Sequence, residues 1–268
     1  MSGIRTGTVT SADGTVIVFD QSGEGPAVVL VPGALMGRAD PVMSGIAAGL
    51  SRWFSVFSYA RRGRGDSSAT RPYAVRREAE DLAALIAAAG GSAAVFGGSS
   101  GAGLAARAAA GNPAITRLAL WEPPYHVDDT APRLPPDFAA QLDGLVSAGR
   151  RAEAVELFLV RAAEASPDAV AGLRGQPFWQ AIEASAQTLA YEAFVMGPGN
   201  ALPARLLAGI TQPTLVLNGG DSPVWMRRAG EAVSGAIPGA VHRVLERQVH
   251  YVAPGAIVPE LLEFFVTA

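Results

Sequence analysis

The amino-acid sequence predicts an α/β protein with a mostly parallel, doubly wound sheet and an inserted helical cap. Apolar runs of strand length alternate with helical stretches along most of the 268 residues, and repeated βα units imply parallel strands with helices on both faces. From about residue 123 to residue 203 the alternation stops and only helical stretches remain. A third observation is Gly97-Gly98-Ser99-Ser100-Gly101, which lies between an apolar run and an Ala-rich helical stretch.

The first 122 residues are expected to provide six strands and two helices. Asp13-Gly14 is a tight-turn dipeptide and predicts a hairpin between the first two strands. The apolar run at 27–31 ends at Pro32-Gly33, which is typical of a strand buried on both faces. The expected strands are 6–10, 15–20, 27–31, 55–59, 93–96 and 115–121, and the expected helices are 75–89 and 101–110.

Residues 123–203 are predicted to be a helical cap inserted into the core domain, which comprises residues 1–122 and 204–268. An insertion at the carboxyl edge of the sheet would lie where open α/β sheets bind ligands. The expected cap helices lie near 137–148, 151–165 and 180–195. Beyond the cap, the expected strands are 214–217 and 241–245, and the expected helices are 224–235 and 259–265.

The composition is that of a globular protein with a full core, and it excludes several chemistries. Apolar residues make up 49% of the chain and charged residues 17%. The net charge of −3, with no block of like charges, favours neither nucleic acid nor an anionic membrane as a partner. Cysteine and lysine are both absent, which excludes thiol nucleophiles, disulfides, thiolate metal sites and lysine-based chemistry. No metal ion or cofactor is expected, and the oligomeric state stays open.

The expected location is the cytoplasm. The N-terminal segment 1–5 lacks the apolar core of a signal peptide. Charged residues interrupt every apolar run before it reaches the length needed to cross a bilayer.

Ser99 is the candidate nucleophile. A Gly-x-Ser-x-Gly sequence between a strand and a helix forms a sharp turn that holds one serine hydroxyl out on a strained backbone. Glycines flank the serine because strand and helix approach too closely there for a Cβ atom. The amide groups at the start of the following helix point toward the place where negative charge develops during acyl transfer. The neighbouring Ser100 would lose one of the two flanking glycines and is the weaker candidate.

Four segments, in matching order and spacing, resemble the α/β-hydrolase family over nearly the whole chain. They are VLVPGA at 29–34, SYARRGRGDS at 58–67, AAVFGGSSGAGLAARAA from residue 93, and the tail that contains His250. The resemblance implies the fold, Ser99 as the nucleophile, and His250, in the loop after the last strand, as its base. Two positions depart from the family pattern: Pro32 stands where histidine is usual before Gly33, and Gly98 stands where histidine is frequent. Both positions shape the loops around the serine.

The other two histidines and the acid complete the candidate list. His242, at the start of the last strand, is expected at the surface, whereas His126 lies at the entrance to the cap. Asp221 follows the penultimate strand and preserves the order serine, aspartate, histidine, although it comes one position early for the family pattern. Glu122 directly follows the strand 115–121. Both acids stay open, and Asp221 is preferred.

The resemblance also implies an oxyanion hole made by the backbone N–H groups of Ala34 and Ser100. The arginines at 61, 62 and 64 are expected to brace neighbouring loops rather than to bind phosphate. The side chains expected to contact substrate are Leu35, His126, Trp179 and Phe194.

These residues together predict a serine hydrolase that cleaves a small carboxylic ester or lactone through an acyl-enzyme on Ser99. One alternative is a perhydrolase, or cofactor-free haloperoxidase, that uses the same residues with peroxide attacking the acyl-enzyme. The other alternative is a member of the fold that binds a ligand without hydrolysing it.

Overall fold

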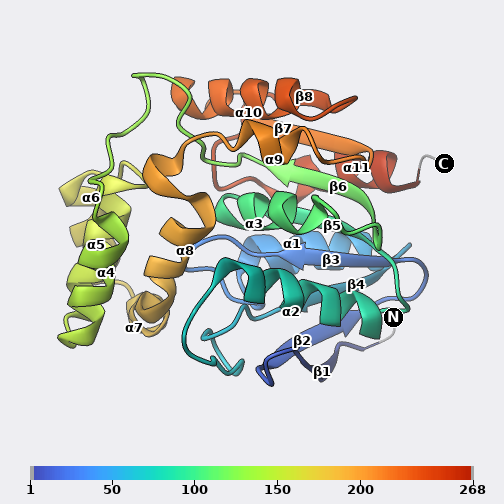
Figure 1. Cartoon of the computed structure of the whole chain (residues 1–268), viewed down its shortest axis with the longest axis horizontal. Coiled ribbons are helices and arrows are strands. Elements are labelled where there is room, and N and C mark those ends of the chain that lie inside the picture. Colours follow the sequence, from blue (N-terminus) through green and yellow to red (C-terminus); the bar gives the residue numbers. More distant parts are fainter. Residues whose placement is uncertain (1–2, 267–268) are drawn as a thin grey trace.

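A computed structural model describes residues 3–266, and its centre is one sheet of eight strands (Figure 1). The strands run in the order β1-β2-β4-β3-β5-β6-β7-β8 across the sheet. Their bounds are Arg5–Thr10 for β1, Val16–Ser22 for β2, Ala27–Val31 for β3, Ser55–Tyr59 for β4, Ala93–Gly98 for β5, Ile115–Trp121 for β6, Thr214–Gly219 for β7 and Val241–Leu245 for β8. The sheet confirms the predicted fold class.

Six of the eight strands form consecutive parallel pairs, and β2 of the N-terminal hairpin is antiparallel to both of its neighbours, β1 and β4. β1 pairs with β2 in a register that sets Thr10 opposite Val16, so the chain turns at Asp13 and Gly14 as predicted. β2 then pairs antiparallel with β4, and every later pair is parallel. β3 and β5 are buried along their whole length, because helices cover both faces of the sheet.

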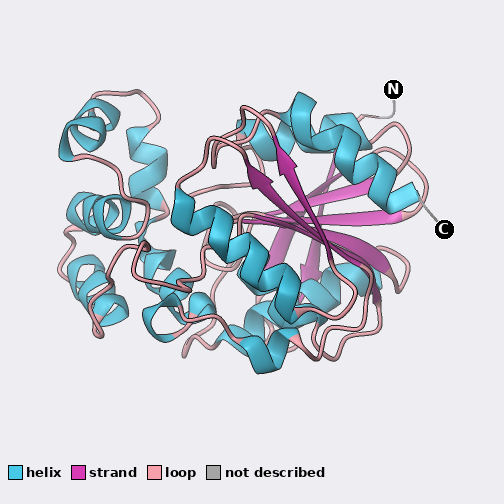
Figure 2. Ribbon diagram, turned by 90° about the horizontal axis from the view of Figure 1, so that it is seen from above, coloured by secondary structure: helices cyan, strands magenta, loops and turns pink. Residues whose placement is uncertain are grey.

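Two sets of helices cover the two faces (Figure 2). One face packs against α1 (Pro41–Leu50) and α11 (Pro254–Val266), with Ile46 and Leu261 among the fully buried side chains. The other face packs against α2 (Val75–Ala88), α3 (Ser100–Ala109) and α10 (Val224–Ala236), with Leu85, Leu104 and Val233 in its core. Apolar strand side chains alternate between these two cores, as the two-residue period of a strand requires.

The interval 123–203 contains none of the eight strands and forms a group of short helices beside the sheet (Figure 1). These helices bury an apolar cluster of their own, which includes Phe138, Leu142 and Trp179. Their bounds are Phe138–Ser147 for α4, Arg151–Arg161 for α5, Pro167–Arg174 for α6, Trp179–Ala184 for α7 and Leu189–Met196 for α8, and the short α9 (Ala204–Leu207) follows. The helices of this region therefore have a core of their own and lie at the carboxyl edge of the sheet.

Several helices differ from the sequence expectations. α6 and α9 were not expected, and the stretch expected as one helix at 180–195 is divided between α7 and α8. α1 is additional, and its first turn is fixed by Asp40, whose carboxylate accepts hydrogen bonds from the amides of Val42 and Met43. α11 begins at Pro254 rather than at Pro259, which lies inside the helix. In residues 3–266 no helix is both long enough and apolar enough to cross a membrane.

Candidate active site

Ser99 occupies a strained turn between β5 and α3. Its backbone has φ 55° and ψ −129°, a conformation that non-glycine residues rarely adopt. Two flanking glycines make the turn possible: a Cβ on Gly97 would lie 2.5 Å from the carbonyl oxygen of Gly101, and a Cβ on Gly101 would lie 2.4 Å from the carbonyl oxygen of Val31. The helix α3 starts at the next residue, so its N-terminal amides point toward the serine.

Glu122 and His250 form a hydrogen-bonded pair beside Ser99. The Nδ1 atom of His250 lies 2.7 Å from Oε2 of Glu122. The glutamate side chain has no exposed surface, whereas 41% of the histidine side chain is exposed. Because an ionised carboxylate can only accept, the pair fixes the proton of the neutral imidazole on Nδ1 and leaves Nε2 as an acceptor.

Groups at the carboxyl ends of β6 and β7 hold this pair in place. The amide of Gly219 donates to Oε1 of Glu122 at 2.7 Å, so both carboxylate oxygens are engaged. The indole N–H of Trp121 donates to the carbonyl oxygen of His250 at 2.8 Å. The amide of Ser99 donates to the carbonyl oxygen of Trp121 at 2.8 Å, which ties the serine turn to the same strand end.

The preference for Asp221 as the partner of His250 is corrected by these contacts. Asp221 is exposed, and its amide donates to the carbonyl oxygen of Gln248 at 2.9 Å. That bond holds the turn after β7 against the loop after β8, with the Asp221 side chain in solvent. Glu122, the second acid considered, is the residue that meets the imidazole.

The loop after β3 passes close to Ser99. A Cβ on Gly33 would lie 2.9 Å from the carbonyl oxygen of Gly98 and 3.0 Å from Cβ of Ser99. Because of this contact, Ala34, the next residue along the chain, lies near Ser99. Ser100, on the other side, is the first residue of α3. The two amides expected to hold an oxyanion therefore belong to segments that flank Ser99.

Two buried arginines connect this loop to the cap. Arg64 donates to the carbonyl oxygens of Gly33 at 2.5 Å and Met36 at 3.2 Å, and it also forms an ion pair with Glu192 on α8. Arg61 donates to the other oxygen of Glu192 at 2.9 Å. The guanidinium groups brace loops, as expected, and they attach the loop after β3 to a cap helix.

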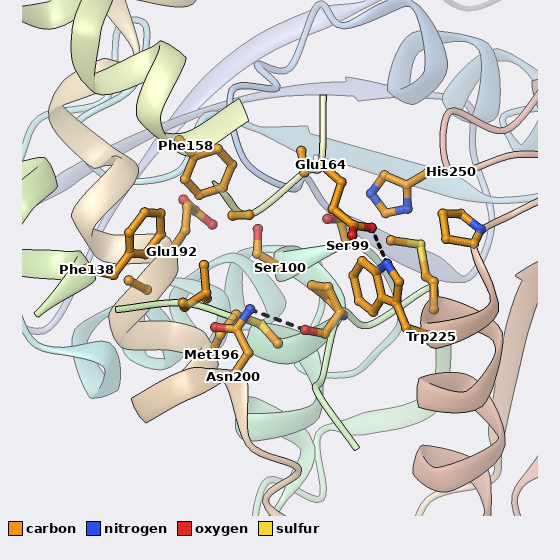
Figure 3. Close-up of a pocket in the computed structure, with 17 residues that line it drawn as sticks. Ser99, Ser100, Phe138, Phe158, Glu164, Glu192, Met196, Asn200, Trp225 and His250 are labelled. Carbon is orange, nitrogen blue, oxygen red and sulfur yellow. Dashed lines mark hydrogen bonds between the residues drawn. The ribbon is translucent and has the colours of Figure 1, made fainter. Parts of the chain in front are cut away.

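A cavity of about 130 Å³ lies between the cap and the sheet, with Ser99, Ser100 and His250 in its wall (Figure 3). Figure 3 shows phenylalanine rings from the cap on one side and an indole ring on the other. The apolar lining side chains are Leu134, Phe138, Phe158, Met196, Trp225 and Met226. Both glutamates in the wall are engaged, since Glu192 pairs with arginines and Glu164 accepts from the indole N–H of Trp225.

A second cavity of about 50 Å³ lies on the α1 side of the same two residues. Ser99 and His250 line it, as they line the larger cavity, so both cavities meet at this pair. Gly98 also lines the smaller cavity, and most of the remaining wall is apolar. An atom held at Ser99 could therefore carry two groups, one in each cavity.

The four side chains expected to contact substrate line neither cavity. Leu35 packs against the cap core, and Trp179 is buried within it. Phe194 is 51% exposed, with its ring 5.8 Å from the ring of Tyr73. His126 stacks edge-on against Trp225 with ring centroids 5.5 Å apart, and burial lowers its pKa.

His242 is tied into the fold away from both cavities. Its Nε2 atom lies 2.9 Å from Oδ1 of the buried Asn218 on β7. Burial lowers the pKa of His242, so the neutral ring is favoured at this position.

Sequence reasoning identified Ser99, Ser100 and His250 in the wall of the larger cavity, but not the aromatic side chains in the rest of it. Phe138 and Phe158 belong to separate cap helices, and Trp225 lies in the first turn of α10. Their helical spacing predicts a buried face but not which face meets the sheet. In the described part of the chain, no group of three or more His, Asp and Glu residues could hold a metal ion.

A scan of family models matches residues 28–259 to one described as the alpha/beta hydrolase family. A search of curated proteins gave no match. Among solved structures, an alpha/beta hydrolase from Sphaerobacter thermophilus DSM 20745 is 52% identical over 97% of this chain and 100% of that one, with a TM-score of 0.92.

More distant structures share the fold. An esterase from Rhodococcus sp. ECU1013 is 22% identical over 99% of each chain, with a TM-score of 0.71. An enol-lactonase from Burkholderia xenovorans LB400 is 20% identical over 97% of this chain and 100% of that one, with a TM-score of 0.74.

Proposed function

The chain belongs to the alpha/beta hydrolase family, and on this premise we propose that it is a serine hydrolase of small carboxylic esters or lactones. The observation that carries the proposal is the meeting of Ser99 and His250 in the walls of both cavities, with Glu122 hydrogen bonded to the far side of the imidazole. A hydroxyl on a strained turn, a base and an orienting carboxylate are the parts that acyl transfer requires.

In the first step Ser99 Oγ attacks the carbonyl carbon and gives its proton to Nε2 of His250. The new bond joins Oγ to the carbon, and the electron pair of the carbonyl moves to its oxygen. The amides of Ala34 and Ser100 then stabilise this oxyanion, and each such donor typically contributes about 10² to 10³ in turnover. Collapse breaks the bond to the leaving alkoxide, which takes the proton from His250 and departs as the alcohol.

In the second step water attacks the acyl-enzyme. His250 takes one proton from the water, the oxyanion forms again, and its collapse breaks the bond to Ser99 Oγ. The proton returns to that oxygen, and a carboxylic acid leaves. Glu122 keeps the ring in the productive tautomer throughout and stabilises the imidazolium form.

The cavity walls favour an uncharged substrate. Within the described residues, the side chains that line the two cavities include two glutamates and no arginine. The nearby guanidinium groups of Arg61 and Arg64 are already bound to Glu192 and to backbone carbonyl oxygens. A carboxylate on the substrate would therefore lose hydration without an unpaired arginine in either wall to offset the cost.

The test uses a fluorophosphonate probe, which phosphonylates an activated serine, together with p-nitrophenyl esters. We expect Ser99 of the wild-type protein to displace fluoride from the probe, so that the protein gains the mass of one probe less HF, and we expect it to hydrolyse the esters. Ser99→Ala should do neither. Ser234→Ala is the matched control, because that hydroxyl bonds within its own helix and lines neither cavity. Tight binding of an ester without labelling or turnover would favour the ligand-binding alternative. Faster release of the acyl group to peroxide than to water would favour the perhydrolase.

A further inference from the structure

The smaller cavity is built around Gly98, the residue before Ser99. A Cβ on Gly98 would have Cε of Met43 as its nearest neighbour, at 3.5 Å, which is an ordinary contact distance. Gly97 and Gly101 are different, since a Cβ on either would lie within 2.5 Å of a backbone oxygen. The φ angle of Gly98 is also outside the left-handed region. The turn therefore requires glycine at 97 and 101 but not at 98.

The missing side chain leaves open space directly beside the reacting serine. Apart from Ser99 and His250, the remaining wall is made by Met36, Val42, Met43, Phe96, Trp121, Tyr251 and Val252. It is mostly apolar: its polar side-chain groups are the hydroxyl of Tyr251, a residue that is 59% exposed, and the indole N–H of Trp121. That N–H already donates to the carbonyl oxygen of His250. A group that enters this cavity gains apolar contact and finds little to hydrogen bond.

The volume limits the size of that group. An apolar cavity of about 150 Å³ takes one benzene molecule, which corresponds to roughly 25 Å³ for each carbon. The cavity beside Gly98 measures about 50 Å³, which at that density has room for roughly two carbons. The larger cavity, of about 130 Å³, has room for roughly five.

We propose that the cavity at Gly98 is the subsite for a short apolar acyl chain, and that Gly98 and Met43 set its length limit. This inference rests on the proposed function. Phe96, Trp121 and Val42 are each no more than 5% exposed, so the floor of the cavity is the protein core. The acyl group stays on Ser99 between the two steps, so it can occupy the small cavity that ends at the core. The alcohol must leave after the first step, so we place it in the larger cavity under the cap.

Two variants test the length limit from opposite directions. Gly98→Val fills the subsite, and Met43→Ala enlarges it at a position outside the turn. The substrates are p-nitrophenyl acetate, propionate and hexanoate, and the measured quantity is kcat/KM. One methylene in an apolar pocket changes kcat/KM by about 10- to 200-fold. We therefore expect Gly98→Val to lower the propionate-to-acetate ratio at least tenfold and Met43→Ala to raise the hexanoate-to-acetate ratio at least tenfold.

The control acts on the other cavity. Ala193→Val narrows the larger cavity, and we expect it to change the preference among methyl, butyl and hexyl acetates while the acyl-chain ratios stay within twofold of the wild type. Unchanged acyl-chain ratios in both Gly98→Val and Met43→Ala would overturn the inference. A shift in alcohol-chain preference in those two variants, in place of acyl-chain preference, would also overturn it.

Fluorophosphonate labelling separates this inference from the proposed function. A wild-type protein that neither labels nor turns over refutes both. Labelling of all variants with unmoved acyl preference refutes only the subsite. If Gly98→Val disturbs the turn enough to prevent labelling, Met43→Ala decides the result alone.

Discussion

The carboxylate of Glu122 lies 2.7 Å from Nδ1 of His250, although the two residues are 128 positions apart in the chain. β6 ends immediately before the glutamate, and the histidine lies in the loop after β8, with β7 between these two strands. The hydrogen bond therefore crosses the end of β7, whose last residue, Gly219, donates to the same carboxylate. A buried acid thus orients a partly exposed imidazole from the interior side.

Replacing Glu122 by glutamine is expected to lower kcat for p-nitrophenyl acetate by about 10⁴, the loss seen for the corresponding change in a serine protease. The amide can present N–H to Nδ1 and so favour the wrong tautomer of His250. Asp221→Asn is the matched control, because that side chain is exposed, and its kcat should stay within about twofold. A large loss in Asp221→Asn beside full activity in Glu122→Gln would reverse the assignment.

Gly33→Ala is expected to lower kcat by about 10², close to the value of one oxyanion donor. The added Cβ would lie 2.9 Å from the carbonyl oxygen of Gly98, so the loop must move and carry the Ala34 amide with it. Gly37→Ala, in the same loop, adds a Cβ with no atom within 4 Å and should leave kcat unchanged. Equal kcat values for the two variants would show that the amide of Ala34 takes no part.

Arg64→Met is expected to reduce both stability and kcat. Removing one partner of a buried ion pair typically costs about 3–5 kcal/mol in the free energy of unfolding. The same change leaves the carbonyl oxygens of Gly33 and Met36 without this donor. Urea unfolding measures the first effect, and ester hydrolysis at saturating substrate measures the second.

Arg62→Met is the control that separates the loss of a buried arginine from the loss of contacts to the loop after β3. Arg62 is equally buried but pairs with Asp13 and Asp81, away from the loop after β3. We expect a similar loss of stability in Arg62→Met with kcat retained. In the double variant Arg64→Met/Glu192→Met, Arg61 loses Glu192 but keeps its ion pair with Glu78, so one buried cation and one buried anion still balance. Stability should therefore largely return, whereas kcat should stay low. An equal fall of kcat in both arginine variants would rule out a specific effect on the loop.

The pair of Arg61 and Glu78 predicts a loss of stability in acid. Burial alone would raise the pKa of Glu78, but the charge and hydrogen bonds of Arg61 outweigh it and hold this pKa below its ordinary value. The unfolded chain therefore binds a proton at a higher pH than the folded one does. The contribution of Glu78 is complete above about pH 4.5, the ordinary glutamate value, and it declines as the pH falls further.

Thermal unfolding at a series of pH values measures this effect. In Glu78→Gln the melting temperature should be lower at pH 7, because Arg61 loses one carboxylate, and it should fall less steeply than that of the wild type below pH 4.5. Parallel curves for the two proteins over the acid range would contradict the prediction.

The strand pattern could be predicted from the sequence because each strand carries its own signal. The apolar run at 27–31 and the turn at Asp13 and Gly14 appear in the structure as expected. α1 had a signal too, since Asp40 followed by Pro41 is a typical helix start. The expectation that the last helix starts at Pro259 was wrong. α11 begins five residues earlier, at Pro254, and Pro259 lies inside it, since a helix can continue through a proline by bending locally.

The strained turn at Ser99 and the alternation that builds the sheet can be predicted from local sequence, because both depend on residues close together in the chain. Tertiary contacts were needed to show that Glu122, and not the exposed Asp221, meets His250. They were also needed to show that Phe158 and Trp225, rather than Trp179 and Phe194, line the larger cavity. These outcomes depend on how a turn is held after β7 and on which faces of the cap helices meet the sheet. Contacts between segments far apart in the chain determine both features, and the periodicity within a single helix or strand does not predict such contacts.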